Sequence, residues 1–399
     1  MPQRTIAFGI MAAALKGASQ FAPGAVLPPE PRLSRNLSAA AASLGIDVYV
    51  FSPDGFDPDT GKLAGCKFEQ GGWKLALVPL PDVVYDRSFP KSADSQRRCA
   101  AALSGMSEWK HHERINGRLP SKLQVYDCLR GRSAIAPYLP QTAHYRTVAQ
   151  LEEILPELPQ GAVLKPAAGM QGRGFLHIEA SPWTPGELTV FGRTRNNVPF
   201  KETFRSFAAL GAWLQSFMGS SPFLVQPYLP LRSADDRPYD IRVLLQKDER
   251  GTWQVSGSAA RLGSPDSLTS NLHGGGVAEP AADTLAANFM PTKAEHLLKK
   301  IHAISGQTAL LLEESFGRFG ELAFDFGLEP SGKLWLLEVN AKPGRESFHL
   351  TGDQKAAKLS IIRLLQYARY LTNRNAPTFP KAGESASDRL SRPESKHRP

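Results

Sequence analysis

Two carboxylates and an amide stand close together near the end of the chain, within two apolar runs. A β-hairpin from Glu321 to Asn340 is predicted, because these runs flank a Pro-Ser-Gly-Lys turn at residues 330–333. Side chains along a strand alternate between its two faces. Asp325 therefore shares a face with Glu321, and Glu338 shares a face with Asn340.

The expected register brings the acidic side chains together. A loop that pairs Glu329 with Leu334 places Asp325 directly opposite Glu338, with Cβ atoms about 5 Å apart, where like charges repel. This arrangement indicates a bound cation. Asp325, Glu338 and Asn340 offer hard oxygen ligands, which suit Mg²⁺ (or Mn²⁺) carrying nucleotide phosphates. A polar stripe facing solvent is the alternative, because a slip of one residue would separate the pair.

A lysine followed by a Gly-rich loop forms the second chemical feature. Lys165 closes the predicted strand 162–165, and Gly169, Gly172 and Gly174 follow it. An ammonium group and free backbone N–H groups at such a position could bind phosphates. An ordinary flexible loop is the alternative.

The third feature is the end of the predicted strand 223–226. Two prolines, Pro227 and Pro230, lack an N–H group. The donors beside Gln226 are therefore the N–H groups of Tyr228 and Leu229, which could bind the edge of an adenine ring.

Several well-known motifs are excluded. Residues 55–62 resemble a Walker A loop, but five residues separate the glycines and Leu63 stands where Ser or Thr is required. Residues 111–116 lack the second histidine of a zinc protease motif, and no GxSxG sequence occurs. Gly169, Gly172 and Gly174 stand between two strands, whereas a dinucleotide-binding turn joins a strand to a helix.

The elements that must position these residues fall into two groups. The first hundred residues alternate strands and helices, which predicts a small doubly wound α/β unit over residues 1–114. The strands expected there are 6–11, 46–51, 75–78 and 83–85, with a helix at 33–44.

The pattern changes after residue 115 to mixed strands and helices without a βαβ rhythm, which predicts an α+β body over residues 115–371. The strands expected there are 162–165, 175–179, 223–226, 241–246, 253–259 and the hairpin at 321–340. The helices expected are 122–130, 293–305, 309–316 and 356–371. A lid subdomain is expected at about 145–230.

The bulk composition narrows the class of protein. The 399 residues carry 47 Lys/Arg and 38 Asp/Glu, a formal charge of +9, and 42% are hydrophobic, as in a globular protein of two or three units. The basic residues are scattered, without interleaved aromatics, so no nucleic-acid partner is predicted. Cys66, Cys99 and Cys128 are odd in number, widely spaced and without a CxxC pair, so they signal neither a disulfide framework nor a zinc site, and a reducing cytoplasm fits.

The two ends of the chain carry their own signals. Residues 6–15 faintly imitate a signal peptide, but Lys16 ends the apolar run early and a buried strand explains it equally well. No stretch approaches 18 apolar residues, so no membrane span is predicted. Residues 372–399 are rich in Pro, Ser and Arg and are predicted to form a disordered basic tail.

Taken together and in this order, the three features resemble the ATP-grasp superfamily over roughly residues 115–370, and the preceding unit resembles its usual N-terminal partner domain. A narrower resemblance is to the YheC/YheD-type branch, which is named as endospore coat-associated. It is carried by Pro81–Arg87, Asn116–Lys122, Tyr239–Arg242, Asn271–Gly276 and Glu338–Gly344.

The resemblance implies a set of site residues. Lys122 and Lys165 would contact the α- and β-phosphates of ATP, with Arg242 on the transferring phosphate or an acceptor. The remaining roles are a phosphate lid (Gly169, Gln171, Gly172, Gly174), an adenine hinge (Gln226, Tyr228, Leu229), a metal site (Asp325, Glu338, Asn340), a γ-phosphate contact (Asn271) and an anionic-substrate site (Arg261, Lys342, Arg345).

The resemblance also implies an activity. Ligases of this superfamily transfer the γ-phosphoryl group of ATP to a carboxylate, and an amine attacks the resulting acyl-phosphate. We therefore expect an ATP- and Mg²⁺-dependent carboxylate–amine ligase, whose acceptor could be a peptide or protein. The alternatives are a kinase that phosphorylates a hydroxyl group and a nucleotide-binding spore-coat or scaffold component without turnover. The residue pattern identifies neither the acceptor nor the oligomeric state.

Overall fold

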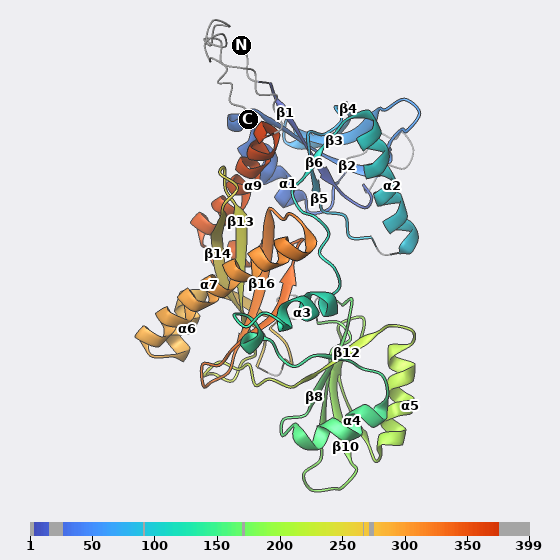
Figure 1. Ribbon diagram of the computed structural model, residues 1–399, viewed down its shortest axis with the longest axis vertical. Helices are drawn as coiled ribbons and strands as arrows, with labels where there is room; N and C mark the ends of the chain where they lie inside the picture. Colours follow the sequence, from blue (N-terminus) through green and yellow to red (C-terminus); the bar gives the residue numbers. More distant parts are fainter. Residues whose placement is uncertain are drawn as a thin grey trace, which may run out of the picture.

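The molecule is built on three six- or five-stranded sheets that follow one another along its long axis (Figure 1). The computed structural model describes residues 4–15, 27–90, 92–169, 172–265, 267–270 and 275–374. The first sheet is largely parallel and the other two are antiparallel. The expected α/β unit followed by an α+β body is therefore confirmed.

The first sheet has the strand order β4-β3-β2-β1-β5-β6. Strands β1, β2, β5 and β6 run parallel, and β3 and β4 form an antiparallel hairpin at the edge. The strands are β1 (Ile6–Met11), β2 (Ile46–Phe56), β3 (Leu63–Glu69), β4 (Gly72–Val78), β5 (Val83–Asp86) and β6 (Glu113–Arg114). Helix α1 (Pro31–Ala41), continued by η1 (Ala42–Leu44), packs on one face, and α2 (Ala93–Trp109) packs on the other.

Helix α2 is absent from the sequence-based expectation, although the sequence carries its signal. Ser92 caps the helix by accepting a hydrogen bond from the N–H of Ser95. The buried residues of α2 recur at helical spacing, and they are Cys99, Ala102, Leu103 and Met106.

The second sheet has the order β11-β10-β9-β8-β12-β7. Helices α4 (Val148–Ile154), η3 (Leu155–Glu157) and α5 (Phe207–Met218) cover one face and form a core with Leu164, Ile178 and Val190. The strands are β7 (Ala143–His144), β8 (Ala162–Pro166), β9 (Leu176–Ala180), β10 (Leu188–Arg193), β11 (Pro199–Phe204) and β12 (Phe223–Pro227).

The third sheet, of order β15-β14-β13-β16-β17, lies between the other two in Figure 1. Its strands are β13 (Tyr239–Lys247), β14 (Trp253–Leu262), β15 (Val277–Pro280), β16 (Glu321–Leu328) and β17 (Leu334–Asn340). Its largest core lies against α3 (Lys122–Arg130), η2 (Ala136–Tyr138), α6 (Ala281–Asn288) and α7 (Pro291–Phe316). The opposite face meets α8 (Glu346–Leu350) and α9 (Gln354–Arg374). Every residue of β16 is buried, so a solvent-facing polar stripe there is excluded.

The expectation of two helices at 293–305 and 309–316 is wrong. A single helix, α7, spans Pro291–Phe316. Gly306 disfavours a helix by about 1 kcal/mol relative to alanine. The buried stripe nevertheless continues on both sides of it, through Ile301, Ile304, Thr308 and Leu312, and this packing outweighs the local preference.

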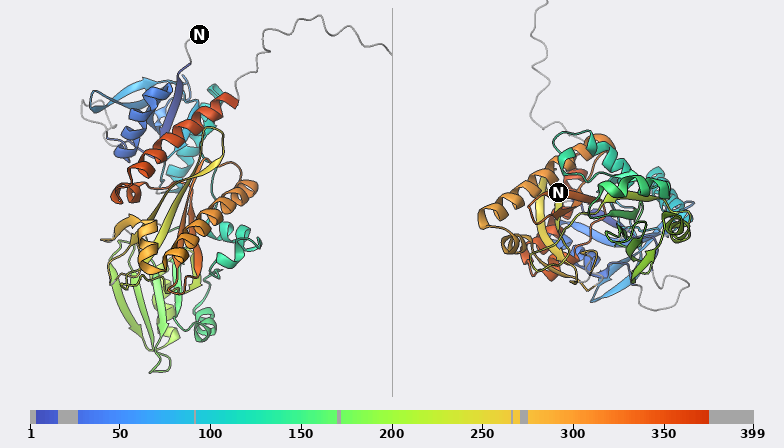
Figure 2. Two further views of the ribbon diagram at one scale, coloured as in Figure 1. Left: turned by 90° about the vertical axis from the view of Figure 1, so that its left-hand side faces the viewer. Right: turned by 90° about the horizontal axis from the view of Figure 1, so that it is seen from below.

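Helix α9 joins the last part of the chain to the first sheet. It lies along α1 in Figure 2 (left) and places Leu364, Leu365 and Ala368 in the core beneath β1 and β5. The helix ends at Arg374, three residues into the predicted tail, and residues 375–399 lie outside the described residues. None of the described helices is long and apolar enough to cross a membrane.

The packing of α9 predicts a stability effect. Leu365 is fully buried, whereas Leu310 on α7 is 61% exposed. We expect Leu365→Ala to lower the free energy of unfolding by roughly 2–5 kcal/mol, because it leaves a cavity in a packed core. Leu310→Ala, the matched control, should change it by about 0.5 kcal/mol or less. Denaturant titration measures both, and equal effects would contradict the role assigned to α9.

Candidate nucleotide and metal site

The hairpin β16–β17 holds the acidic pair in the predicted relation. Asp325 lies opposite Glu338, and Asn340 donates from Nδ2 to Oδ2 of Asp325 over 3.4 Å. The predicted loop register was wrong by one residue, because Leu334 pairs with Leu328 and not with Glu329. The register shifts between Asp325 and Phe326, and this β-bulge restores the predicted pair.

Arginines compensate the buried carboxylate of Asp325. Arg242 donates from Nε and Nη2 to the two oxygens of Asp325 over 2.8 and 2.7 Å. Arg261 places Nη2 3.1 Å from Oδ2 of Asp325, and it pairs with both oxygens of Asp240. Cross-strand pairing explains the contacts, because Arg242 lies opposite Asp325 and Arg261 lies opposite Asp240.

Burial alone would raise the pKa of the Asp325 carboxyl, but Arg242 and Arg261 outweigh it and hold that pKa well below its usual range. Asp325 is therefore an anion at any ordinary pH. Burial raises the pKa of Asp240, and so does the neighbouring charge of Asp325.

The two predicted nucleotide lysines lie beside Glu338. Lys122, at the start of α3, places Nζ 3.1 Å from Oε1 of Glu338 and donates to the carbonyl oxygen of Gly169 over 2.8 Å. Burial and the like charge of Lys122 lower the pKa of Lys165 from 10.5 to about 8, although Glu338 opposes the shift. The helix α3 is fixed by a capping box between Ser121 and Gln124.

A pocket lies where α3, β8, β12 and β17 meet. It is lined by both lysines, Gln226 and Glu338, and otherwise mainly by apolar side chains. The apolar members are Leu119, Pro120, Val125, Leu129, Leu139, Pro140, Leu224, Leu336, Leu337 and Val339. A mostly apolar wall with a few charged groups at one side suits an aromatic base attached to phosphates.

The adenine hinge needs a correction. The N–H group of Tyr228 is not a free donor, because it bonds to the carbonyl oxygen of Gly161 over 2.9 Å. The ring of Tyr228 stacks on His177 with centroids 3.8 Å apart. The N–H of Leu229 has no partner among the described residues and remains available for an adenine edge. Gln226 donates from Nε2 to Thr142.

The predicted lid loop is described only in part. Gly172 and Gly174 adopt positive φ angles of 69° and 73°, which favour glycine. Gly174 donates its N–H to the carbonyl oxygen of Arg193. Gln171 and Asn271, predicted for the lid and the γ-phosphate, lie outside the described residues.

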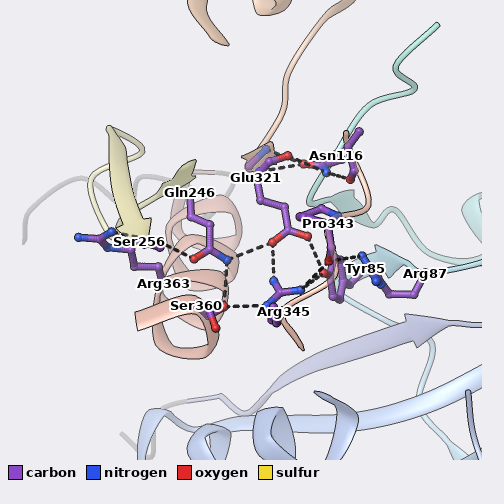
Figure 3. A network of polar contacts seen from close by, with 12 residues as sticks. Tyr85, Arg87, Asn116, Gln246, Ser256, Glu321, Pro343, Arg345, Ser360 and Arg363 are labelled. Carbon is purple, nitrogen blue, oxygen red and sulfur yellow. Dashed lines mark hydrogen bonds and ion pairs between the residues drawn. The ribbon is translucent and has the colours of Figure 1, made fainter. Parts of the chain in front are cut away.

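Two of the three residues predicted for an anionic substrate, Lys342 and Arg345, do not line the pocket. Lys342 is part-buried, and its Nζ lies 2.9 Å from Oδ1 of Asp86 and donates to the carbonyl oxygen of Ser88. Arg345 is buried in the network of Figure 3, where Nη2 pairs with Glu321 and Nη1 donates to the hydroxyl of Tyr85. Each of its three nitrogens bonds to protein, so Arg345 is not carried forward as a substrate ligand.

Asn116 has a positioning role that its residue type alone does not reveal. Its Nδ2 donates to the carbonyl oxygens of Glu321 and Ala341, and its Oδ1 accepts from the N–H groups of Gly320 and Glu321. One side chain thereby joins the start of β16 to the residue after β17, at the open end of the metal hairpin (Figure 3). The signal in the sequence was its place in a motif shared with the family that the chain resembles.

The donor set fits a magnesium ion carried by a nucleotide. In the part of the chain that the structure describes, no three His, Cys, Asp or Glu side chains form a metal centre. The ligands offered are the carboxylates of Asp325 and Glu338 and the amide of Asn340. Three protein ligands leave coordination positions of Mg²⁺ for phosphate oxygens and for the water molecules that this ion usually retains. The negative charges of Asp325 and Glu338 are compensated by Arg242 and Lys122.

The network around Arg345 predicts a structural effect. We expect Arg345→Met to lower the free energy of unfolding by about 3–5 kcal/mol, because Glu321 would stay buried without a counter-charge. Glu321→Gln in the same chain should recover much of this loss, since no unpaired charge then remains. Urea denaturation of the three variants measures it. A stable Arg345→Met variant would instead favour a role in ligand binding.

The pKa of Lys165 predicts how nucleotide affinity depends on pH. The lysine is charged below a pH of about 8 and neutral above it, so phosphate binding weakens as pH rises through that value. We expect the affinity for ADP to be level below a pH of about 7 and to fall by up to about tenfold per pH unit above 8. Titration calorimetry measures this. In Lys165→Met the dependence in this range should vanish, and an unchanged profile would contradict the prediction.

Comparison with known proteins agrees with this geometry. Residues 111–371 match the family model described as YheC/D like ATP-grasp. The endospore coat-associated protein YheC of Bacillus subtilis (strain 168) is 28% identical over 329 residues, which are 82% of this chain and 89% of that protein. YheD of the same organism is 27% identical over 335 residues, 84% of this chain and 72% of that protein.

Solved structures show the same fold at low sequence identity. An ADP complex of PurK, an N5-carboxyaminoimidazole ribonucleotide synthetase, matches with a TM-score of 0.50 and 16% identity over 91% of this chain and 78% of that chain. The D-cycloserine synthetase DcsG matches with a TM-score of 0.50 and 13% identity over 92% and 99% of the two chains. The chain therefore belongs to the YheC/D-like ATP-grasp family.

Proposed function

We propose that the protein is a Mg²⁺- and ATP-dependent ligase that joins a carboxylate to an amine through an acyl-phosphate. The observation that carries this proposal is the convergence of Lys122, Lys165 and Glu338 on one pocket, beside Asp325 and Asn340. The ATP-grasp fold supports it, since PurK and DcsG, both named as synthetases, share that fold.

The chain's own residues would bind and orient the nucleotide. The N–H group of Leu229 would receive the adenine edge, and the apolar pocket wall would contact the ring. Lys122 and Lys165 would neutralise the α- and β-phosphates. Lys122 would exchange Glu338 for a phosphate within the pocket, because Lys122 and Glu338 both line it.

Asp325, Glu338 and Asn340 would hold magnesium, which when bound supplies positive charge to the phosphate oxygens. Arg242 keeps Asp325 ionised and oriented through two hydrogen bonds. Its Nη1 has no partner in the described part of the chain, which leaves one donor for a transferring phosphoryl group. Arg261 is buried between Asp240 and Asp325, so we assign it a positioning role.

The proposed reaction balances in two steps. A carboxylate oxygen attacks the γ-phosphorus and ADP leaves, which gives the acyl-phosphate. The amine nitrogen then attacks the carbonyl carbon, phosphate leaves and the nitrogen loses a proton. Neither step requires a covalent bond to protein, so positioning and charge are what the site must supply.

Release of ADP tests the proposal. We expect ADP release only when a carboxylate and an amine are both present, in a screen of amino acids and short peptides with hydroxylamine as a general amine. The product should be the hydroxamate or amide, identified by its mass, together with free phosphate. A stable phosphorylated product without free phosphate would indicate a kinase instead, and bound ATP without any turnover would indicate a scaffold.

A matched pair of variants completes the test. Glu338→Gln should reduce turnover by about 100-fold or more, because it removes a metal-binding charge, and second-shell changes alone cost 10–100-fold. Glu295→Gln removes an exposed carboxylate on α7 whose one ion-pair partner among the described residues is Lys299. It should leave turnover unchanged, and equal losses in both variants would argue against the assigned site.

A further inference from the structure

One buried arginine of the described chain has no carboxylate partner. Four arginines are buried, and three form ion pairs: Arg87–Glu30, Arg261–Asp240 and Arg345–Glu321. The fourth, Arg193, is 7% exposed and forms no ion pair with any described residue. It stands at the end of β10 in the second sheet.

The contacts of Arg193 are few and neutral. Nη1 donates to the carbonyl oxygen and to Oδ1 of Asn197 over 3.3 and 3.2 Å, and Nη2 donates to the hydroxyl of Ser267 over 2.9 Å. Nε is buried without a hydrogen-bond partner in the described structure. A guanidinium that is removed from water and meets only neutral acceptors is costly to the folded protein. An anionic ligand would supply the missing charge.

The turn after β10 holds this side chain in place. Asn197 has a φ angle of 67°, in the left-handed region that is uncommon for residues other than glycine. Its N–H bonds to the carbonyl oxygen of Thr194, which closes the turn around the guanidinium. The turn therefore fixes Nη1, whereas Nη2 bonds to Ser267 and Nε has no hydrogen-bond partner in the described structure.

Arg193 shares a face of the second sheet with Lys165. Leu164 pairs with Leu176, and Leu176 pairs with Gly192. One residue further along, Phe175 therefore lies between Lys165 on β8 and Arg193 on β10. Residues directly opposite one another on neighbouring strands point to the same face. Strand spacing places the Cα atoms of Lys165 and Arg193 about 10 Å apart. The opposite face is filled by the core under α4 and α5.

Arg193 contacts both the predicted lid loop and the loop that follows β14. Its carbonyl oxygen accepts from Gly174 of the predicted lid loop. Its partner Ser267 belongs to the third sheet's loop after β14. Ser270 of that loop bonds to Asp240, which Arg261 joins to Asp325. Arg193 therefore lies where the second sheet meets the loop after β14, and this loop is linked to Asp325 through Ser270, Asp240 and Arg261.

We propose that Arg193 is an anion ligand that binds the terminal phosphoryl group of the nucleotide. Lys165 neutralises the inner phosphates at one end of the shared face, and Arg193 receives the outer phosphoryl group at the other. The guanidinium also joins the second sheet to the loop after β14 through Ser267, so binding of the triphosphate strengthens this contact. This inference rests on the nucleotide site of the proposed function.

The test compares two nucleotides in Arg193→Gln. By titration calorimetry with Mg²⁺, we expect the affinity for the β,γ-imido analogue of ATP to fall by about tenfold or more, because charged hydrogen bonds to the outer phosphoryl group are lost. The affinity for ADP should stay within about twofold of the parent chain, as the inner phosphates keep their lysines. Equal losses for both nucleotides, or none, would overturn the inference.

Arg195→Gln is the matched control. Arg195 lies two residues further along and also bonds only to neutral acceptors, the carbonyl oxygen of Met218 and the hydroxyl of Ser221, but it is exposed. Neither nucleotide affinity should change in this variant. A loss equal to that of Arg193→Gln would show a general effect of positive charge and would overturn the specific role.

Thermal unfolding separates a ligand role from a structural one. Without nucleotide, Arg193→Gln should melt at the same temperature as the parent chain or higher, because a buried, uncompensated charge is removed. If Asp266, which precedes Ser267 in sequence, were a structural counter-charge, Arg193→Gln and Asp266→Asn would both melt lower, and the inference would fail. If the parent chain bound neither nucleotide, the proposed function would fail as well; normal binding without discrimination by Arg193→Gln refutes the inference alone.

Discussion

A charge that is buried in a protein must meet an opposite charge or a ligand, and this constraint organises the whole molecule. The interior of the third sheet holds Glu321, Asp325 and Asp240, and each has an arginine partner. These pairs also connect elements that are distant in sequence. Glu321 and Arg345 tie the third sheet to Tyr85 of the first, and Arg242 ties β13 to the acidic residue of β16.

The site follows from the same constraint. Two carboxylates on neighbouring strands repel each other, so β16 and β17 are stable in this register only with cations beside them. Arg242 and Arg261 form ion pairs with Asp325, and Lys122 forms one with Glu338. A bound nucleotide with its metal would exchange these cationic partners for the metal ion. Arg193 differs because no residue in the described part of the chain supplies it with an opposite charge.

The sequence predicted the structure correctly where a residue pattern is compatible with one local arrangement. The hairpin turn and strand alternation predicted that Asp325 faces Glu338, and the structure confirms it. The predicted loop register was nevertheless wrong by one residue, and a β-bulge after Asp325 compensated for the difference. The bulge could not be predicted, because it leaves no mark on a period-two pattern. The apolar stripe of α7 continued across Gly306, where local preference predicted a break.

Roles that depend on contacts between distant segments could not be predicted. The N–H of Tyr228 is taken by Gly161, 67 residues earlier, and the guanidinium of Arg345 is taken by Glu321 and Tyr85. Both residues looked available in the sequence because their partners are distant in the chain. Pairing of β12 with β8 brings Gly161 to Tyr228, and packing of the first sheet against the third brings Tyr85 and Glu321 to Arg345. That Arg193 has no carboxylate partner among the described residues is likewise visible only when its neighbours in space are known.

The most direct measurement is a crystal structure of the protein with Mg²⁺ and the β,γ-imido analogue of ATP. We predict that the adenine edge accepts a hydrogen bond from the N–H of Leu229 and that the inner phosphates contact Lys122 and Lys165. It also predicts the metal on Asp325, Glu338 and Asn340, and the outer phosphoryl group within hydrogen-bonding distance of Arg193. A nucleotide bound elsewhere, or a metal bound without these three ligands, would contradict it.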